Sequence, residues 1–104
     1  MSNIHVIAVI TANPGQRAAL LELFNQNVPA VKAEEGCIAY EATIDTKGAG
    51  PMQTEFGPDT FVVVEQWDSM QALGAHAVAP HMKEYSARTK GMVADSKIHI
   101  LSPA

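Results

Sequence analysis

Apolar residues recur along the chain with two different periods. Two segments have the spacing of helices, about 14–35 and 69–93, and Pro80 interrupts the second. Four segments have the alternation or apolar runs typical of strands: residues 4–11, 37–45, 60–67 and 96–101. The order β-α-β-β-α-β predicts an α+β, ferredoxin-like βαββαβ sandwich, in which two helices cover one face of a four-stranded antiparallel sheet.

Local signals place the ends of the first helix. Asn13 precedes Pro14, a pair that suits a helix cap followed by the first helical position. Pro29 should kink this helix or break its last turns. Gly36 then supplies a stop signal just beyond the end.

Two of the predicted strands are apolar on both faces. In residues 60–67, Phe61 and Val63 alternate with Val62 and Val64, and residues 4–11 follow the same pattern. Two helices cover only one face of such a sheet, and leaving apolar surface in water costs about 25 cal/mol per Å². A second copy of the same sheet is the simplest cover, so we expect a homodimer.

Composition narrows the class of protein further. The 104 residues fit one domain, 1–104, and their net charge of −4 without a Lys/Arg cluster disfavours nucleic acid as a partner. The single Cys37 excludes an intrachain disulfide and suits a reducing compartment. The apolar N-terminal stretch has no basic start or cleavage site, and no apolar run reaches the ~20 residues that a bilayer requires. We therefore expect a cytoplasmic protein without a membrane partner.

Most signatures of cofactor and metal chemistry are missing from the sequence. It contains no phosphate-binding glycine loop, no CxxC and no HExxH, so we expect neither cofactor nor metal. His76 and His81 would lie about 140° apart on a regular helix, which argues against a shared metal ion.

The candidate catalytic and binding residues lie mainly on the third predicted strand and on the helix after it. Glu65 and Trp67 alternate with Gln66, and a carboxylate on this apolar face should have a raised pKa unless it is paired. Trp67 could stack on a flat substrate or fill the core. His76 follows where the helix turns back over the sheet, and it could be a general base or a partly buried structural histidine.

For the remaining candidate residues, a structural role is more common than a functional one. Tyr40 and Tyr85 could line a pocket, although a core position is the commoner role for each. The position of His81, beside Pro80 at a helix start, favours a structural role for this residue. Cys37 has no basic neighbour and reads as an inert core thiol.

Several stretches resemble one known family. VIAVITANPGQ, EEGCIAYEATID, FVVVEQW and HAVAPHMKEYS are similar to the antibiotic biosynthesis monooxygenase superfamily, and to its bacterial quinol monooxygenases, from about Ile4 to Pro103. The resemblance implies a ferredoxin-like dimer whose two sheets meet as a dimeric α+β barrel. It also implies oxidation of electron-rich phenols or quinols by O₂ without metal or flavin. A deprotonated quinol can itself pass an electron to O₂, which would explain why no cofactor motif is legible.

This resemblance implies roles for individual residues and leaves two alternative functions open. A cofactor-independent monooxygenase would use His76 as general base and Glu65 to orient it. The substrate-binding residues would be Trp67, Tyr85, Tyr40 and His81. Haem-degrading relatives carry an Asn near the position of Ala8, so haem is not expected. The alternatives are an isomerase of a small, phosphorylated carbonyl compound of the autoinducer-processing type, or a non-catalytic ligand-binding dimer of a stress response.

Overall fold

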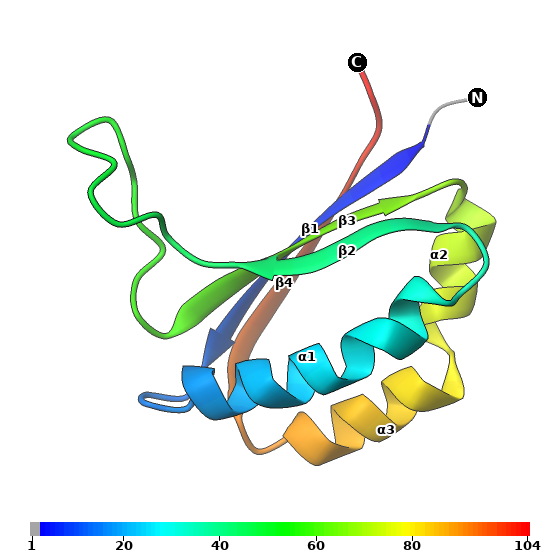
Figure 1. Cartoon of the computed structure of the whole chain (residues 1–104), viewed down its shortest axis with the longest axis horizontal. Helices are drawn as coiled ribbons and strands as arrows, with labels where there is room; N and C mark the ends of the chain where they lie inside the picture. Colours follow the sequence, from blue (N-terminus) through cyan, green and yellow to red (C-terminus); the bar gives the residue numbers. More distant parts are fainter. Residues whose placement is uncertain (1–2) are drawn as a thin grey trace.

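A computed structural model describes residues 3–104, which form an antiparallel sheet with three helices packed on one face (Figure 1). The elements in chain order are β1 (Ile4–Ala12), α1 (Arg17–Lys32), β2 (Cys37–Thr43), β3 (Thr60–Trp67), α2 (Met70–Ala77), α3 (Pro80–Thr89) and β4 (Val93–Leu101). The strand order is β2-β3-β1-β4, with every neighbouring pair antiparallel. This confirms the predicted ferredoxin-like fold. Within the described residues, no helix has the length and hydrophobicity needed to cross a membrane.

Several predicted element boundaries were wrong. The first helix begins at Arg17, because the Asn13 side chain donates to the Gly91 carbonyl at 2.8 Å instead of capping a helix. Pro29 lies inside α1, which continues to Lys32 without a break. The interruption expected at Pro80 is confirmed, since α2 ends at Ala77 and Pro80 begins α3.

The far end of the second helical segment was also misplaced. α3 ends at Thr89 and β4 already begins at Val93, so Met92 and Val93 do not belong to a helix face.

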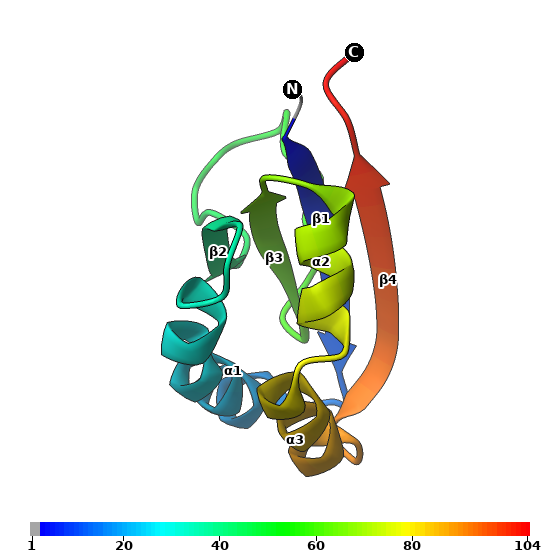
Figure 2. The same ribbon diagram turned by 90° about the vertical axis from the view of Figure 1, so that its right-hand side faces the viewer.

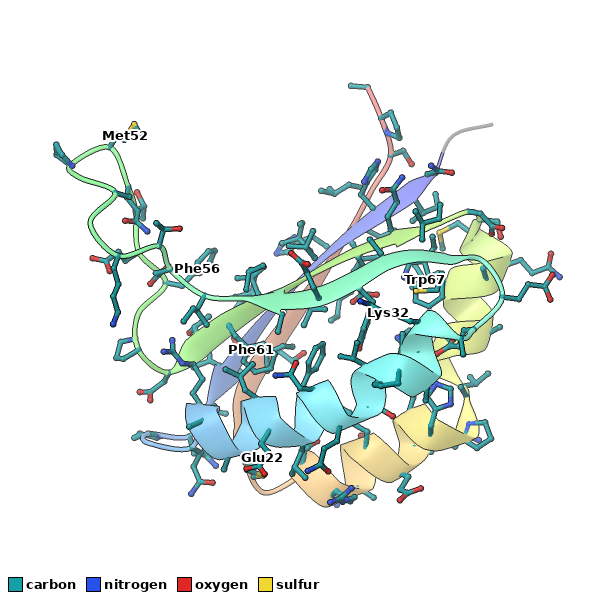
Figure 3. The ribbon with its side chains drawn as sticks, viewed as in Figure 1. Glu22, Lys32, Met52, Phe56, Phe61 and Trp67 are labelled. Carbon is teal, nitrogen blue, oxygen red and sulfur yellow. The ribbon has the colours of Figure 1, made fainter. Side chains whose placement is uncertain are left out.

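The loop between β2 and β3 contains no strand, and it carries Met52 and Phe56 away from the helices (Figure 3).

The core lies between the sheet and α1. In the β1–β3 register, Ile4 pairs with Trp67 and Ala8 with Val63, and such paired side chains lie on the same face of the sheet. Phe61 and Trp67 extend from opposite ends of β3 into the layer below the sheet (Figure 3). The buried residues of α1 that meet this face are Leu20, Phe24 and Val31.

The helices do not cover the whole width of the sheet. β4 stands beyond α2 and α3, with no helix in front of it (Figure 2). Ile98 and Ile100 pair with Ala8 and Val6, so both face the helical side, yet they are 57% and 51% exposed. The space between sheet and helices is therefore open along β4.

The opposite face of the sheet carries no helix. Val62 and Val64 lie on it and are 9% and 38% exposed, and Ile7 and Val9 are half-buried beside them. The prediction that the central strands are apolar on both faces is confirmed.

Gly36 joins two parts of the chain at close range. It has φ +85°, a conformation that favours glycine, and its carbonyl accepts from the Asp68 amide at 2.9 Å. A Cβ at this position would lie 2.5 Å from Ala72 Cβ and 2.6 Å from Asp68 Oδ1. This contact holds the turn after α1 against the start of α2.

Substituting Gly36 should therefore cost more than its backbone conformation alone. Gly15→Ala is the matched control, because Gly15 has φ +79° but no neighbour where a Cβ would lie. We expect Gly15→Ala to lower the free energy of unfolding by about 1–2 kcal/mol. Gly36→Ala should cost about 1–3 kcal/mol more, because atoms must move. Urea unfolding of both variants measures this, and equal losses would contradict the close contact.

Candidate active site

A cavity of about 410 Å³ lies between the sheet and the helices, on the side that opens along β4. Most of its wall is apolar. The aliphatic part of the wall comes mainly from Val6, Ala8, Ile10, Val63, Leu73, Met82 and Ile98. The aromatic and ionisable part comes from Phe24, Tyr40, Glu65, His76 and Tyr85. An apolar hollow with a few convergent polar groups is the usual form of a small-molecule site.

Glu65 is the carboxylate that the sheet contributes. It lies opposite Tyr40 in the β2–β3 register and is 7% exposed. Its Oε1 accepts a hydrogen bond from Trp67 Nε1–H at 2.9 Å. Burial raises the pKa of Glu65, while the Trp67 hydrogen bond and the charge of His76 partly oppose that rise. The sequence-based expectation of a raised pKa is confirmed, with an indole as the partner.

The Trp67 side chain lies behind His76, on the buried side of the site. Its side chain has no exposed surface, and its ring centroid lies 4.6 Å from that of His76. A ring in this position cannot stack on a ligand in the cavity, so the stacking role expected for Trp67 does not fit. Instead, the ring packs against His76 and donates to Glu65, which restricts both side chains.

His76 is carried to the cavity by the last turn of α2. Ser69 begins this helix, accepting from the Ala72 amide at 3.1 Å. His76 Nδ1 lies 2.9 Å from Glu34 Oε2. Because a carboxylate only accepts, Nδ1 carries the proton, and Nε2 is left as the basic nitrogen that can act in the cavity.

Glu34 is the functional candidate that sequence reasoning missed. It was expected that Glu65 would orient His76, but the carboxylate hydrogen-bonded to the ring is Glu34, from the turn after α1. Glu34 and His76 are 42 positions apart, so no local spacing relates them. The available signal was its place two residues before Gly36, in a stretch that resembles the family.

His81 contacts the same oxygen from the other side. Its Nε2 lies 2.7 Å from Glu34 Oε2, and its side chain does not line the cavity. The prediction that His76 and His81 point apart was wrong, because Pro80 begins a new helix between them. Its position also departs from the substrate-binding role expected for His81.

Glu34, His76 and His81 also supply the atoms that could hold a cation. One ligand-type atom from each of Glu34, His76 and His81 lies within 4.8 Å of the others. Two imidazoles and a carboxylate suit a divalent transition metal. The Glu34 oxygen is, however, already at hydrogen-bond distance from both rings, so the set is satisfied without an ion. That the protein needs no metal stays a prediction.

The two tyrosines complete the polar lining. The Tyr40 ring stacks on Phe24 at 5.2 Å and lies 5.5 Å from His76. Burial raises the pKa of Tyr85 to about 12 and raises that of Tyr40 further. Both phenols therefore keep their protons at neutral pH and can donate hydrogen bonds. Burial also raises the pKa of Cys37, as an unreactive thiol requires.

The buried charge of Glu65 should appear in the pH dependence of stability. Its folded pKa is raised above the ordinary value of 4.5, so the wild type loses stability as pH rises through the interval between them. Glu65→Gln keeps an acceptor for Trp67 and removes the charge. We expect the variant to gain stability over the wild type from acid to neutral pH in urea unfolding. Glu22→Gln, on the exposed surface of α1, is the control; a pH-independent loss in Glu65→Gln would contradict this account.

Together, these features define a class: a ferredoxin-like α+β domain whose sheet and helices enclose a largely apolar cavity lined by one imidazole, one carboxylate and two phenols. Residues 3–88 match the family model described as antibiotic biosynthesis monooxygenase, and the chain belongs to that family. It is 45% identical over 100 residues to the probable quinol monooxygenase YgiN of Escherichia coli K12, covering 94% of this chain and 95% of that protein.

Solved structures agree with the fold. PA3566 from Pseudomonas aeruginosa superposes with a TM-score of 0.82 at 27% identity, covering 100% of this chain and 96% of that one. Rv0793 from Mycobacterium tuberculosis gives 0.79 at 26% identity, covering 99% and 96%. The fold and family predicted from the sequence are confirmed.

Proposed function

We propose that the protein is a cofactor-independent monooxygenase that oxidises a quinol or a similar electron-rich polycyclic aromatic with O₂. The observation that carries this proposal is the fixed imidazole of His76 at the wall of a largely apolar cavity. The similarity to YgiN, a probable quinol monooxygenase, supports the same reaction class. Haem is not proposed, because the family resemblance places the Asn of haem-degrading members near Ala8, where this chain has no Asn.

The geometry suits base-initiated oxidation. His76 Nε2 would take the proton from a quinol hydroxyl, because Glu34 holds the other nitrogen as a donor. The resulting quinolate is the electron-rich species that can reduce O₂. A cavity wall formed mostly by aliphatic and aromatic side chains would bind a flat substrate and limit access of water to the reduced oxygen.

The phenols would complete substrate recognition. Tyr40 and Tyr85 line the same cavity as His76, and both remain protonated donors. A quinol becomes more negative at oxygen as it loses its proton, so a phenol donor would stabilise the quinolate more than the quinol. Glu65 and Trp67 would act indirectly, by holding His76 in place.

We also propose that the protein acts as a homodimer, with two sheets meeting at the faces without helices. Apolar side chains on that face support this, since one copy leaves Val64 38% exposed beside Val62. Such a contact is self-complementary about a two-fold axis and would form a dimeric α+β barrel.

A charge on this face should prevent the association. We expect light scattering of the wild type at micromolar concentration to give twice the chain mass of 11.1 kDa. Val64→Glu should weaken the dimer, because it places a carboxylate among apolar side chains. Ala19→Glu, on the exposed surface of α1, is the matched control and should remain dimeric. A stable, monodisperse wild-type monomer would refute the dimer.

The proposed reaction is tested by O₂ uptake with a panel of quinols, using protein treated with a chelator. His76→Ala should lower kcat by about 10² to 10⁴ at neutral pH. Much of the loss should return at high pH, where the quinol ionises without a base. Glu34→Gln should lower kcat less, since it keeps the ring nearby but removes the charge that stabilises its protonated form.

Other outcomes would favour the other functions. Wild-type kcat in His76→Ala, or a loss equal at every pH, would remove His76 from the reaction. Turnover of a phosphorylated carbonyl compound without O₂ uptake would favour an isomerase. Ligand binding without turnover would favour a non-catalytic stress-response protein. Loss of O₂ uptake on chelation, restored by one metal, would overturn the metal-free mechanism.

A further inference from the structure

Three separate segments bring a carboxylate and two imidazoles to one point. Glu34 belongs to the turn after α1, His76 to the last turn of α2 and His81 to the first turn of α3. Glu34 Oε2 lies 2.9 Å from His76 Nδ1 and 2.7 Å from His81 Nε2, and the three atoms all lie within 4.8 Å of one another. Across residues 3–104, no other three histidine, cysteine or acidic side chains converge closely enough to hold a metal ion.

The chemistry of these donors matches zinc. Two imidazole nitrogens and one carboxylate oxygen form four-coordinate zinc sites, in which water takes the fourth position. Mg²⁺ and Ca²⁺ prefer oxygen ligands and fit this set poorly. Neighbouring ligand atoms around tetrahedral zinc lie about 3.3 Å apart, so the two contacts would lengthen by roughly half an ångström when the ion enters.

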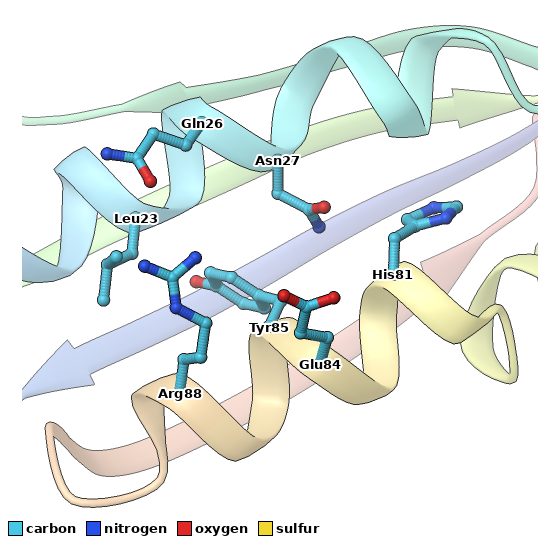
Figure 4. A pocket seen from close by; sticks show the side chains of 7 residues that line it. All are labelled: Leu23, Gln26, Asn27, His81, Glu84, Tyr85 and Arg88. Carbon is cyan, nitrogen blue, oxygen red and sulfur yellow. The ribbon is translucent and has the colours of Figure 1, made fainter.

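A groove on the outside of the molecule leads to these atoms. It has a volume of about 240 Å³ and lies between α1 and α3, with His81 at one end beside Asn27 (Figure 4). The side chains of His76, Glu34 and His81 are 8%, 13% and 28% exposed, so an ion reaches the set from the side of His81. His81 does not line the cavity, and its movement to admit an ion would leave the cavity wall in place.

An ion at this point would change which nitrogen of His76 is basic. Beside the Glu34 carboxylate, Nδ1 carries the proton and Nε2 has the free lone pair. A metal ion binds through a lone pair, so Nδ1 must lose its hydrogen, and the neutral ring then carries its proton on Nε2. The ring keeps one proton throughout, and only the position of that proton changes.

We propose that Glu34, His76 and His81 form a zinc site that switches off the catalytic base. Zinc binding itself does not depend on the proposed function, whereas the inhibition rests on it. With zinc bound, His76 presents an N–H donor to the cavity and cannot accept the proton of a quinol hydroxyl. The ion takes no part in the oxidation, and its removal returns the lone pair to Nε2.

Calorimetric titration of the whole, chelator-treated protein with zinc chloride tests the binding. We expect one zinc ion per chain in the wild type. Glu34→Gln and His81→Gln each replace a ligand, and each should weaken binding by at least about 10- to 100-fold, the loss seen when a group that only supports a ligand is removed. Glu35→Gln is the matched control, because it removes the same charge from the next, exposed residue and should bind zinc like the wild type. Equal affinity in all four proteins, or no binding to the wild type, would overturn the site.

Nitrogen-15 NMR of the histidine rings tests the switch in the wild type, without any substitution. Before zinc is added, the His76 proton should be on Nδ1. At saturation it should be on Nε2, with Nδ1 bound to the ion. A proton that stays on Nδ1 in saturating zinc would overturn the switch, even if zinc binds elsewhere on the protein.

O₂ uptake with quinols then tests the consequence for activity. Saturating zinc should abolish uptake by the wild type and by Glu35→Gln, and a chelator should restore it in both. Full uptake with the site occupied would overturn the inhibitory role. Inert quinols in the zinc-free protein would reject the proposed function, while the calorimetric and NMR results would still decide whether the zinc site exists.

Discussion

The candidate site depends on one shared hydrogen-bond acceptor, the Glu34 carboxylate. It contacts residues 42 and 47 positions away in the sequence and thereby fixes the α1–β2 turn against α2 and α3. Two features of the backbone make this contact possible. Gly36 lets the turn approach Asp68 and Ala72, and the break between α2 and α3 allows two histidines five positions apart to meet one oxygen. A hydrogen bond to an ionised group is among the stronger interactions available to a small protein.

The cavity exists because the sheet is wider than its helical cover. α1 fills the space below β2 and β3 with Leu20, Phe24 and Val31, but no helix stands in front of β4 (Figure 2). Ile98 and Ile100 consequently remain exposed at the entrance. A third long helix over β4 would bury more apolar surface and would leave no room for a ligand. The fold thus gives up some burial where the substrate is proposed to enter.

The sequence was most informative where periodicity is a local property. Alternation in residues 60–67 correctly predicted that Glu65 and Trp67 share the core face, and the order of elements predicted the ferredoxin-like sheet. It was least informative where the deciding contact is distant. Asn13 looked like a helix cap, but Gly91, 78 positions away, takes its side-chain donor. Glu34 was missed for the same reason, because the His76 ring that it contacts lies 42 positions away.

The central claim is that Glu34 holds His76 so that its Nε2 faces a bound quinol. A crystal structure of the protein with a naphthoquinol, grown and frozen without O₂, tests this most directly. The account predicts a quinol hydroxyl within hydrogen-bond distance of His76 Nε2, in the cavity lined by Tyr40 and Tyr85, with His76 Nδ1 still bonded to Glu34. A quinol bound only in the groove beside His81, or a His76 ring turned away from Glu34, would contradict it.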